Sequence, residues 1–324
     1  MPNQTALDFW DISRRQAIAT WRACNSILDT AFYDVGTLTT SEHAGLSAYA
    51  SPEGSVLIVH PRSAARPIRV LTPAAFVDEQ LQETGDPVAT VAIAGVGSSA
   101  LGTAALARNV ADWLGAPVAG IVSGFGVADV VAEALGGWFV FGAKNALREM
   151  VARFLDASLL KDHVRDPESH DDMKAELRSL DTAQDRFLYG SPDSTTMLYL
   201  LLKLGRRLRL LVGHSKGNYS IENALEGWVS SRPSPAILEP FDLRIVTLGA
   251  VIWFPPECAK LHQFLGRIDY FGMLNSRIFV QRIAVPGVWH SLNSALPGHM
   301  SVADALEAVE ALSVGVHDGT GVAR

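Results

Sequence analysis

The chain of 324 residues is 48% hydrophobic and carries a net charge of −7. This length suits one large α/β domain with added segments, or two smaller domains. The acidic balance, together with the lack of a long cluster of lysine and arginine, argues against nucleic acid as a partner.

The sequence also lacks the usual signals of export, membrane insertion and metal binding. Its two cysteines, Cys24 and Cys258, are too few for a disulfide framework and have no metal-ligand spacing. The first residues, MPNQTALDFWDISRRQ, show no basic segment followed by an apolar one, so no signal peptide is expected. No apolar run reaches the roughly 18 residues that cross a bilayer. We therefore expect a soluble cytoplasmic protein, and the sequence leaves its oligomeric state open.

The first fifty residues form a predicted helical extension. Residues 5–35 have apolar side chains at helical spacing, and Trp10, Trp21 and Phe32 add aromatic bulk. The first interpretation is a helix packed on the main domain, because amphipathic helices mostly cover a core. The second is a helix that docks on the surface of a hydrophobic particle.

Residues 51–324 are predicted to form one α/β domain. Near-continuous apolar strands alternate with helical segments, which is typical of a mainly parallel sheet with helices on both faces. The strands of the first half are expected at 55–60, 68–71, 90–95 and 116–124, with helices at 105–115 and 125–137. The charged stretch 144–190 contains no strand-like run and is predicted to be a helical cap insertion.

The second half continues the alternation of strands and helices. Strands are expected at 207–213, 242–249, 264–269 and 276–287, and helices at 195–205, 218–230, around 256–264 and at 301–312.

The pentapeptide Gly-His-Ser-Lys-Gly at 213–217 lies between an apolar strand and a helical stretch. A nucleophile elbow needs this context, because the serine must lie on a tight turn where flanking side chains would clash. The alternative is a serine that caps a helix. The pattern indicates that Ser215 is a nucleophile.

A serine hydroxyl needs a base, which in turn needs an orienting carboxylate. When the serine lies on a nucleophile elbow, the acid follows it along the chain and the histidine comes last. His290 follows a strand that ends in a Pro-Gly turn and is the first choice for the base; His299, before the final helix, is the second. Asp269, at the end of the strand before His290, is the expected acid, ahead of Glu257 and Asp242, which lie a strand earlier.

An oxyanion hole needs two backbone N–H donors. The residue after the serine, Lys216, is expected to supply one of them. The other should come from the loop after an early strand, with Val96 as the first candidate and Gly97 as the next.

Residues 88–315 resemble the α/β-hydrolase superfamily, and within it the class 3-type lipases and esterases. The likeness lies in four segments, at 90–126, 210–225, 245–272 and 285–302. It implies hydrolysis of carboxylic esters through an acyl-enzyme, without a metal ion or an organic cofactor. It also implies Ser215 as nucleophile, Asp269 as acid and His290 as base. Lipases often carry Leu-Gly-Gly after the serine, whereas this chain has Lys-Gly-Asn; the lysine would bind a carboxylate or point to solvent.

Three functions follow from these patterns. The first is an esterase or lipase acting on a small ester, a lipid or a polyhydroxyalkanoate-type polyester. The second is an NAD(P)-binding oxidoreductase, because GVGSSA at 95–100 also fits the dinucleotide fingerprint; that fingerprint expects an acid at the end of the next strand, and the first acid, Asp129, lies inside the following helix. The third is a non-catalytic protein that coats a particle through its N-terminal helix.

Overall fold

The structure is a computed structural model that describes residues 28–48, 53–95, 98–123, 192–230, 242–258, 260–277 and 279–318. Residues 5–27 of the helix expected at 5–35 lie outside these ranges, and so does the whole cap expected at 144–190. Of the helices that are described, none is long and apolar enough to cross a membrane.

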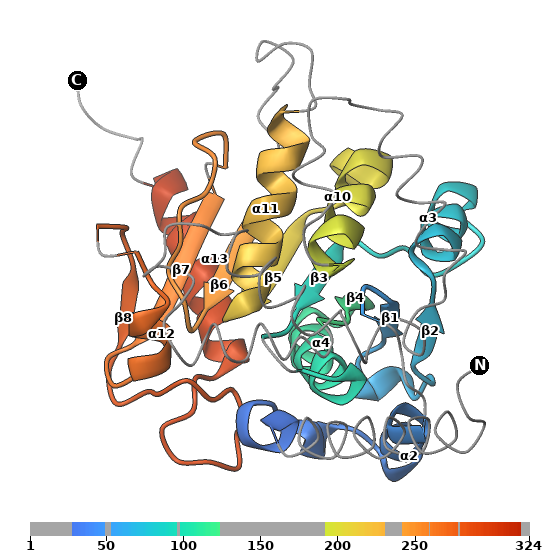
Figure 1. Cartoon of the computed structure of the whole chain (residues 1–324), viewed down its shortest axis with the longest axis horizontal. Coiled ribbons are helices and arrows are strands. Elements are labelled where there is room, and N and C mark those ends of the chain that lie inside the picture. The colour runs from blue at the N-terminus through green and yellow to red at the C-terminus, as the bar shows by residue number, and fades with distance from the viewer. Residues whose placement is uncertain are drawn as a thin grey trace, which may run out of the picture.

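A mixed sheet forms the centre of the described chain (Figure 1), with strand order β2-β1-β4-β3-β5-β6-β7-β8. Strand β1 is antiparallel to its neighbours β2 and β4, and every other pairing is parallel. In chain order the strands are β1 (Val56–Val59), β2 (Arg69–Leu71), β3 (Thr90–Ile93), β4 (Val118–Ile121), β5 (Leu210–His214), β6 (Arg244–Leu248), β7 (Lys260–Gly266) and β8 (Ile283–Val285).

Helices cover both faces of this sheet, as the apolar strands predicted. The α-helices are α2 (Thr40–Ala48), α3 (Pro73–Gln82), α4 (Ala100–Leu114), α10 (Pro192–Leu204), α11 (Lys216–Ser230), α12 (Tyr270–Leu274) and α13 (Val302–Asp318). Short 3-10 helices are η1 (Val35–Thr37), η2 (Arg62–Ala64) and η4 (Gly205–Arg207). In Figure 1, α10 and α11 lie over one face, and α13 is seen behind β6 and β7.

The two faces build two separate apolar cores because successive strand residues point to opposite sides. In β5, Leu211 belongs to the core that includes residues of α3, α10 and α11, whereas Val212 belongs to the core that includes residues of α4 and α13. Both side chains are fully buried. A strand buried on both faces reads as a continuous apolar run, which is why these strands were visible in the sequence.

Helix α4 shows how local signals set the bounds of an element. It begins after Ser99, whose hydroxyl accepts a hydrogen bond from the backbone N–H of Leu101 at 3.0 Å. It ends at Gly115, which has a left-handed φ of 66° that glycine adopts without a steric penalty. The sequence predicted this glycine stop, but placed the start of the helix five residues too late.

Two expectations for the second half were wrong. The helix expected around 256–264 is absent from the described residues, and Lys260–Gly266 forms β7 instead, with Phe264 opposite Leu248 of β6. Pairing with β6 outweighs the weak helical pattern there. Of the described residues in the strand expected at 276–287, only Ile283–Val285 forms a strand, β8. It pairs with β7 at the edge of the sheet and is partly exposed.

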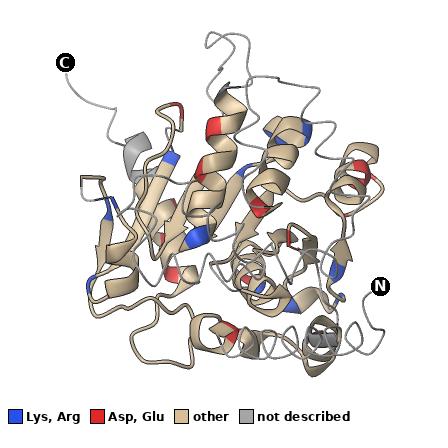
Figure 2. Cartoon of the chain, viewed as in Figure 1, with Lys and Arg blue, Asp and Glu red and all other residues tan. Residues whose placement is uncertain are grey.

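Figure 2 shows acidic and basic residues scattered over the described ribbon, rather than gathered by sign. Several are paired on the surface, as in the contact of Arg62 with Asp112 at 2.7 Å and of Arg66 with Asp86 at 2.6 Å. The absence of a nucleic-acid partner stays a prediction.

Candidate active site

Ser215 lies at a sharp turn between β5 and α11. Its backbone has a φ of 52°, in the left-handed region that residues other than glycine rarely adopt. The neighbouring strand β6 holds this turn in place, because the N–H of Ser215 donates to the carbonyl of Leu248 at 3.0 Å. The expected strand, turn and helix are therefore present around the serine.

The two glycines of the pentapeptide are required by close packing. A Cβ atom at Gly213 would lie 2.3 Å from Oδ1 of Asn218, and one at Gly217 would lie 2.1 Å from the carbonyl oxygen of Ile93. Neither distance leaves room for a side chain. Gly213 therefore lets α11 pack closely on the end of β5, and Gly217 lets the first turn of α11 approach the end of β3.

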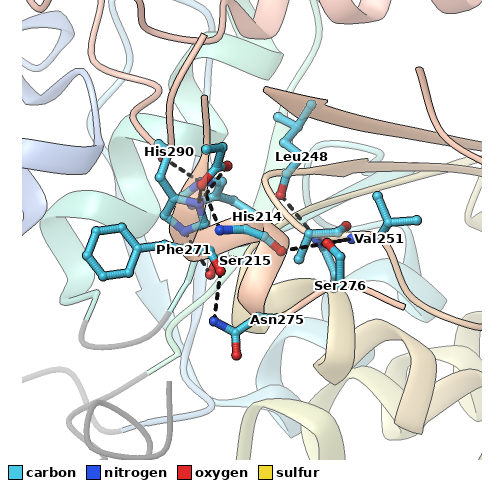
Figure 3. A network of polar contacts seen from close by, with 12 residues as sticks. His214, Ser215, Leu248, Val251, Phe271, Asn275, Ser276 and His290 are labelled. Carbon is cyan, nitrogen blue, oxygen red and sulfur yellow. Dashed lines mark hydrogen bonds and ion pairs between the residues drawn. The ribbon is translucent and has the colours of Figure 1, made fainter. Parts of the chain in front are cut away.

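The structure brings Ser215, His290 and Asp269 together, and Figure 3 shows the first two of these side chains facing each other. Nε2 of His290 lies 3.0 Å from Oγ of Ser215, and its Nδ1 lies 2.9 Å from both carboxylate oxygens of Asp269. A carboxylate only accepts hydrogen bonds, so Nδ1 of His290 carries the proton and Nε2 is left to accept from the serine hydroxyl. All three residues are at most 5% exposed.

Asp269 follows β7 and also caps the short helix α12. One of its oxygens accepts a hydrogen bond from the backbone N–H of Gly272 at 2.6 Å, so the same carboxylate opens a turn and faces His290. The end of β7 packs closely against the segment that leads to His290, because a Cβ at Gly266 would lie 2.1 Å from the carbonyl oxygen of Val288. The two interpretations of this aspartate in the sequence, turn residue and acid, are therefore compatible.

The loop that carries His290 is held by the segment 29–34 of the chain. The N–H of Leu292 donates to the carbonyl of Phe32 at 2.8 Å, and the hydroxyl of Ser291 donates to the carbonyl of Ala31 at 2.8 Å. The ring of Phe32 meets that of His290 edge to face at 5.7 Å. Residues almost 260 positions earlier thus position the imidazole.

His299, the second choice for the base, has a different partner. Its Nδ1 donates to the carbonyl of Leu296 at 2.9 Å, which fixes the ring within its own loop. The contact with Ser215 comes from His290.

The side chain of Lys216 is buried and does not point to solvent. Its Nζ lies 3.3 Å from Asp193 and 3.6 Å from Glu53, and donates to the carbonyl of Ser123 at 3.3 Å. It thus binds carboxylates of its own chain, as a buried cation requires. Lys216 is the first residue of α11 and directly follows the serine. Val96 and Gly97 lie outside the described residues, so the second oxyanion donor stays a prediction.

His214 and Tyr33 belong to the site, although no pattern in the sequence selects them. The rings meet edge to face at 5.4 Å, and the hydroxyl of Tyr33 lies 2.8 Å from Nδ1 of His214. Burial, and then the nearby ring of His290, lower the pKa of His214 well below its usual value, so His214 is neutral at physiological pH. Only the fold brings residues 181 positions apart into contact.

Asp29 is a third buried residue that the sequence patterns do not reveal. It is fully buried and accepts hydrogen bonds from the N–H and hydroxyl of Ser99, the residue that caps α4. Burial raises its pKa to about 6, while the hydrogen bonds from Ser99 and Ser98 oppose that rise. This carboxylate ties the N-terminal segment to the loop after β3.

Comparisons with known proteins add little to this description. No protein-family model and no curated protein matches the chain. Among solved structures, a dienelactone hydrolase-like promiscuous phosphotriesterase from metagenomic libraries is 15% identical, with a TM-score of 0.29; the alignment covers 72% of this chain and 87% of that one.

The chain's own geometry is therefore what defines its fold class. A mainly parallel sheet has helices on both faces, and a serine lies on a strained turn between a central strand and the helix that follows it. An aspartate and then a histidine follow later in the chain, after β7 and β8. This is the arrangement of the α/β-hydrolase fold, and the fold class predicted from the sequence is confirmed.

Proposed function

We propose that the protein is a serine hydrolase that cleaves carboxylic esters through an acyl-enzyme. The observation that carries this proposal is the linear contact from Asp269 through His290 to Ser215, with donor–acceptor distances of 2.9 and 3.0 Å. These distances lie within the reach that proton transfer to a general base requires.

The chemistry proceeds in two steps. As Oγ of Ser215 attacks the ester carbonyl carbon, its proton passes to Nε2 of His290, and the resulting imidazolium is stabilised by Asp269. His290 then gives this proton to the departing alkoxide, which leaves as an alcohol. A water molecule attacks the acyl-enzyme in the same manner, and the acid product leaves with Ser215 restored.

The developing oxyanion would be bound by backbone N–H groups at the elbow. Lys216 is the first residue of α11, and a helix directs its first N–H groups and the positive end of its dipole towards that terminus. Val96, in the loop after β3, is the second proposed donor. Gly95 supports the placement of this loop, because a Cβ there would lie 3.0 Å from Cβ of Ser215.

Apolar side chains around α12 favour an apolar ester. Phe271 is 49% exposed and its ring lies 6.0 Å from that of His290, and both side chains are labelled in Figure 3. Further exposed apolar residues adjoin it in the chain: Ile268, Tyr270, Met273 and Leu274. We define Ile268 to Leu274 as the α12 apolar surface. This surface favours a substrate with an apolar acyl chain, such as a lipid or a polyester, in line with the lipase-like segments of the sequence.

The other two functions gain no support from a specific contact. The N–H of Gly95, the first glycine of the dinucleotide fingerprint, donates to the hydroxyl of Tyr33. The residues proposed to coat a particle, up to residue 27, lie outside the described part of the chain.

The proposal is tested with p-nitrophenyl esters of graded chain length and one hydroxyacid oligomer. We expect Ser215→Ala and His290→Ala to lose about 10³-fold or more in kcat/KM, as loss of a nucleophile or its base does. His299→Ala is the matched control, with activity near that of the wild type. Near-wild-type activity of Ser215→Ala would remove the hydrolase proposal, and damage from His299→Ala with a mild effect of His290→Ala would reassign the base.

A further inference from the structure

The hydroxyl of Tyr33 lies where three parts of the site meet. It accepts a hydrogen bond from the N–H of Gly95, in the loop after β3, at 2.5 Å. It also contacts Nδ1 of His214, in the elbow, at 2.8 Å. Nε2 of the same imidazole lies 3.1 Å from the carbonyl oxygen of His290. These contacts form one chain of three hydrogen bonds.

Each bond in this chain can run in only one direction. The N–H of Gly95 only donates, and the carbonyl of His290 only accepts. Nε2 of His214 must therefore carry the ring proton, and Nδ1 of the neutral ring is left as an acceptor for the Tyr33 hydroxyl. The three hydrogen bonds thus run from Gly95 to Tyr33, from Tyr33 to His214, and from His214 to the backbone carbonyl of His290.

This series of hydrogen bonds links the three backbone segments whose relative positions decide catalysis in the proposed function. Gly95 immediately precedes the proposed oxyanion donor Val96, His214 immediately precedes Ser215, and the accepting carbonyl belongs to the proposed base itself. The rings of His214 and His290 lie 4.8 Å apart. A Cβ at Gly249 would lie 3.1 Å from the ring of His290 and 3.0 Å from that of His214, so both rings are tightly confined.

We propose that Tyr33 and His214 are positioning residues of the active site, which fix the backbone of Gly95 and of His290 relative to Ser215. This inference rests on the proposed function. The Tyr33 hydroxyl also selects the tautomer of His214 that donates to His290. Without it, buried polar groups on Gly95 and His214 lose a partner, and the backbone segments that carry them shift.

Tyr33→Phe tests this proposal, because it removes the hydroxyl and keeps the ring that packs on His214. We expect kcat to fall about tenfold or more while KM stays within about twofold, since misplaced groups weaken the transition state rather than substrate binding. Tyr219→Phe is the matched control: Tyr219 is as buried as Tyr33, and its hydroxyl donates to the carbonyl of Asn275 at 2.6 Å. We expect the control to keep wild-type kcat.

Substitutions of His214 provide a rescue experiment. His214→Leu removes both hydrogen bonds, whereas His214→Gln keeps one donor and one acceptor. We expect Gln to recover part of the kcat that Leu loses. Equal kcat of these two variants, at equal stability, would contradict positioning by hydrogen bonds.

The wild-type protein gives a readout that does not depend on any variant folding. The ¹⁵N chemical shifts of His214 at neutral pH should show a neutral ring protonated at Nε2. A charged ring, or one protonated at Nδ1, would overturn the proposal. Unchanged kcat in Tyr33→Phe, with an inactive Ser215→Ala, would also overturn it and leave the proposed function standing; an active Ser215→Ala would instead remove the function itself.

Discussion

Ser215 combines a reactive position with a strained backbone. Its left-handed φ of 52° accompanies an Oγ that faces His290, and Gly217 allows the turn to pack against the end of β3. Strain of this kind costs about 1–3 kcal/mol and persists only where the surrounding structure enforces it. Here the enforcing contacts are the bond from its N–H to Leu248 and the packing of Gly217 on Ile93.

This strain predicts a difference between two inactive variants. Ser215→Gly relieves the left-handed conformation, whereas Ser215→Ala retains it. The free energy of unfolding, measured with urea, should therefore be about 1 kcal/mol higher for the glycine variant than for the alanine variant. Equal stabilities, or a more stable alanine variant, would show that the turn is not strained.

The sequence nominated Ser215, Asp269 and His290, and the structure brings these side chains together. They were visible because chain order and strand ends restrict where each partner can stand. Tyr33 and Asp29 were not visible, because a lone tyrosine or aspartate in a predicted helix is usually read as a packing or surface residue. Their significance comes from contacts that only the folded chain creates, such as Tyr33 with Gly95.

At the scale of elements, the alternation of strands and helices was predictable and the bounds of weak elements were not. Strands β3 and β5, buried on both faces, stand out as apolar runs. Strand β7 begins with exposed and half-buried residues, so its sequence resembles an amphipathic helix. Helix α12 spans only Tyr270–Leu274, too short for a periodic pattern to reveal it.

The α12 apolar surface predicts a preference for longer acyl chains. Phe271→Ser removes an exposed aromatic ring beside His290. We expect the ratio of kcat/KM for an octanoate ester to that for an acetate ester to fall about tenfold, because one apolar contact contributes about 1–3 kcal/mol to such discrimination.

The control for this experiment is Leu81→Ser, which removes an exposed apolar side chain, 46% accessible, from α3. It should leave the octanoate-to-acetate ratio unchanged. An unchanged ratio in Phe271→Ser as well would mean that α12 does not contact the acyl chain.

At the scale of the whole molecule, the N-terminal segment is part of the site. Asp29 contacts Ser99, Tyr33 contacts Gly95 and His214, and Phe32 holds the loop of His290. A truncation meant to test particle binding must therefore stop before Asp29, since a longer one would remove contacts of the proposed catalytic groups. The division into an extension at 1–50 and a domain at 51–324 stays a prediction.

Asp29 predicts how stability depends on pH. Burial raises the pKa of its carboxyl to about 6 in the folded chain, against an ordinary value of 3.8. Between these values the folded state holds a proton that the unfolded state has released, so the contribution of Asp29 to stability falls as pH rises from about 4 to about 6. It is constant above that window.

The measurement compares urea unfolding of the wild type and Asp29→Asn from pH 4 to pH 7. The free energy of unfolding of the wild type, relative to the variant, should fall by about 3 kcal/mol across the window, since one pKa unit corresponds to about 1.4 kcal/mol. Parallel curves for the two proteins would show that Asp29 does not titrate in this way.

The most direct test of the whole account is covalent labelling of Ser215 by a fluorophosphonate, followed by intact mass and peptide mapping. A serine activated by His290 and Asp269 should take up one phosphonyl group, mapped to Ser215, with strongly slowed labelling in His290→Ala and none in Ser215→Ala. A wild-type protein that stays unlabelled, or a Ser215→Ala protein that is labelled as fast as the wild type, would contradict the account.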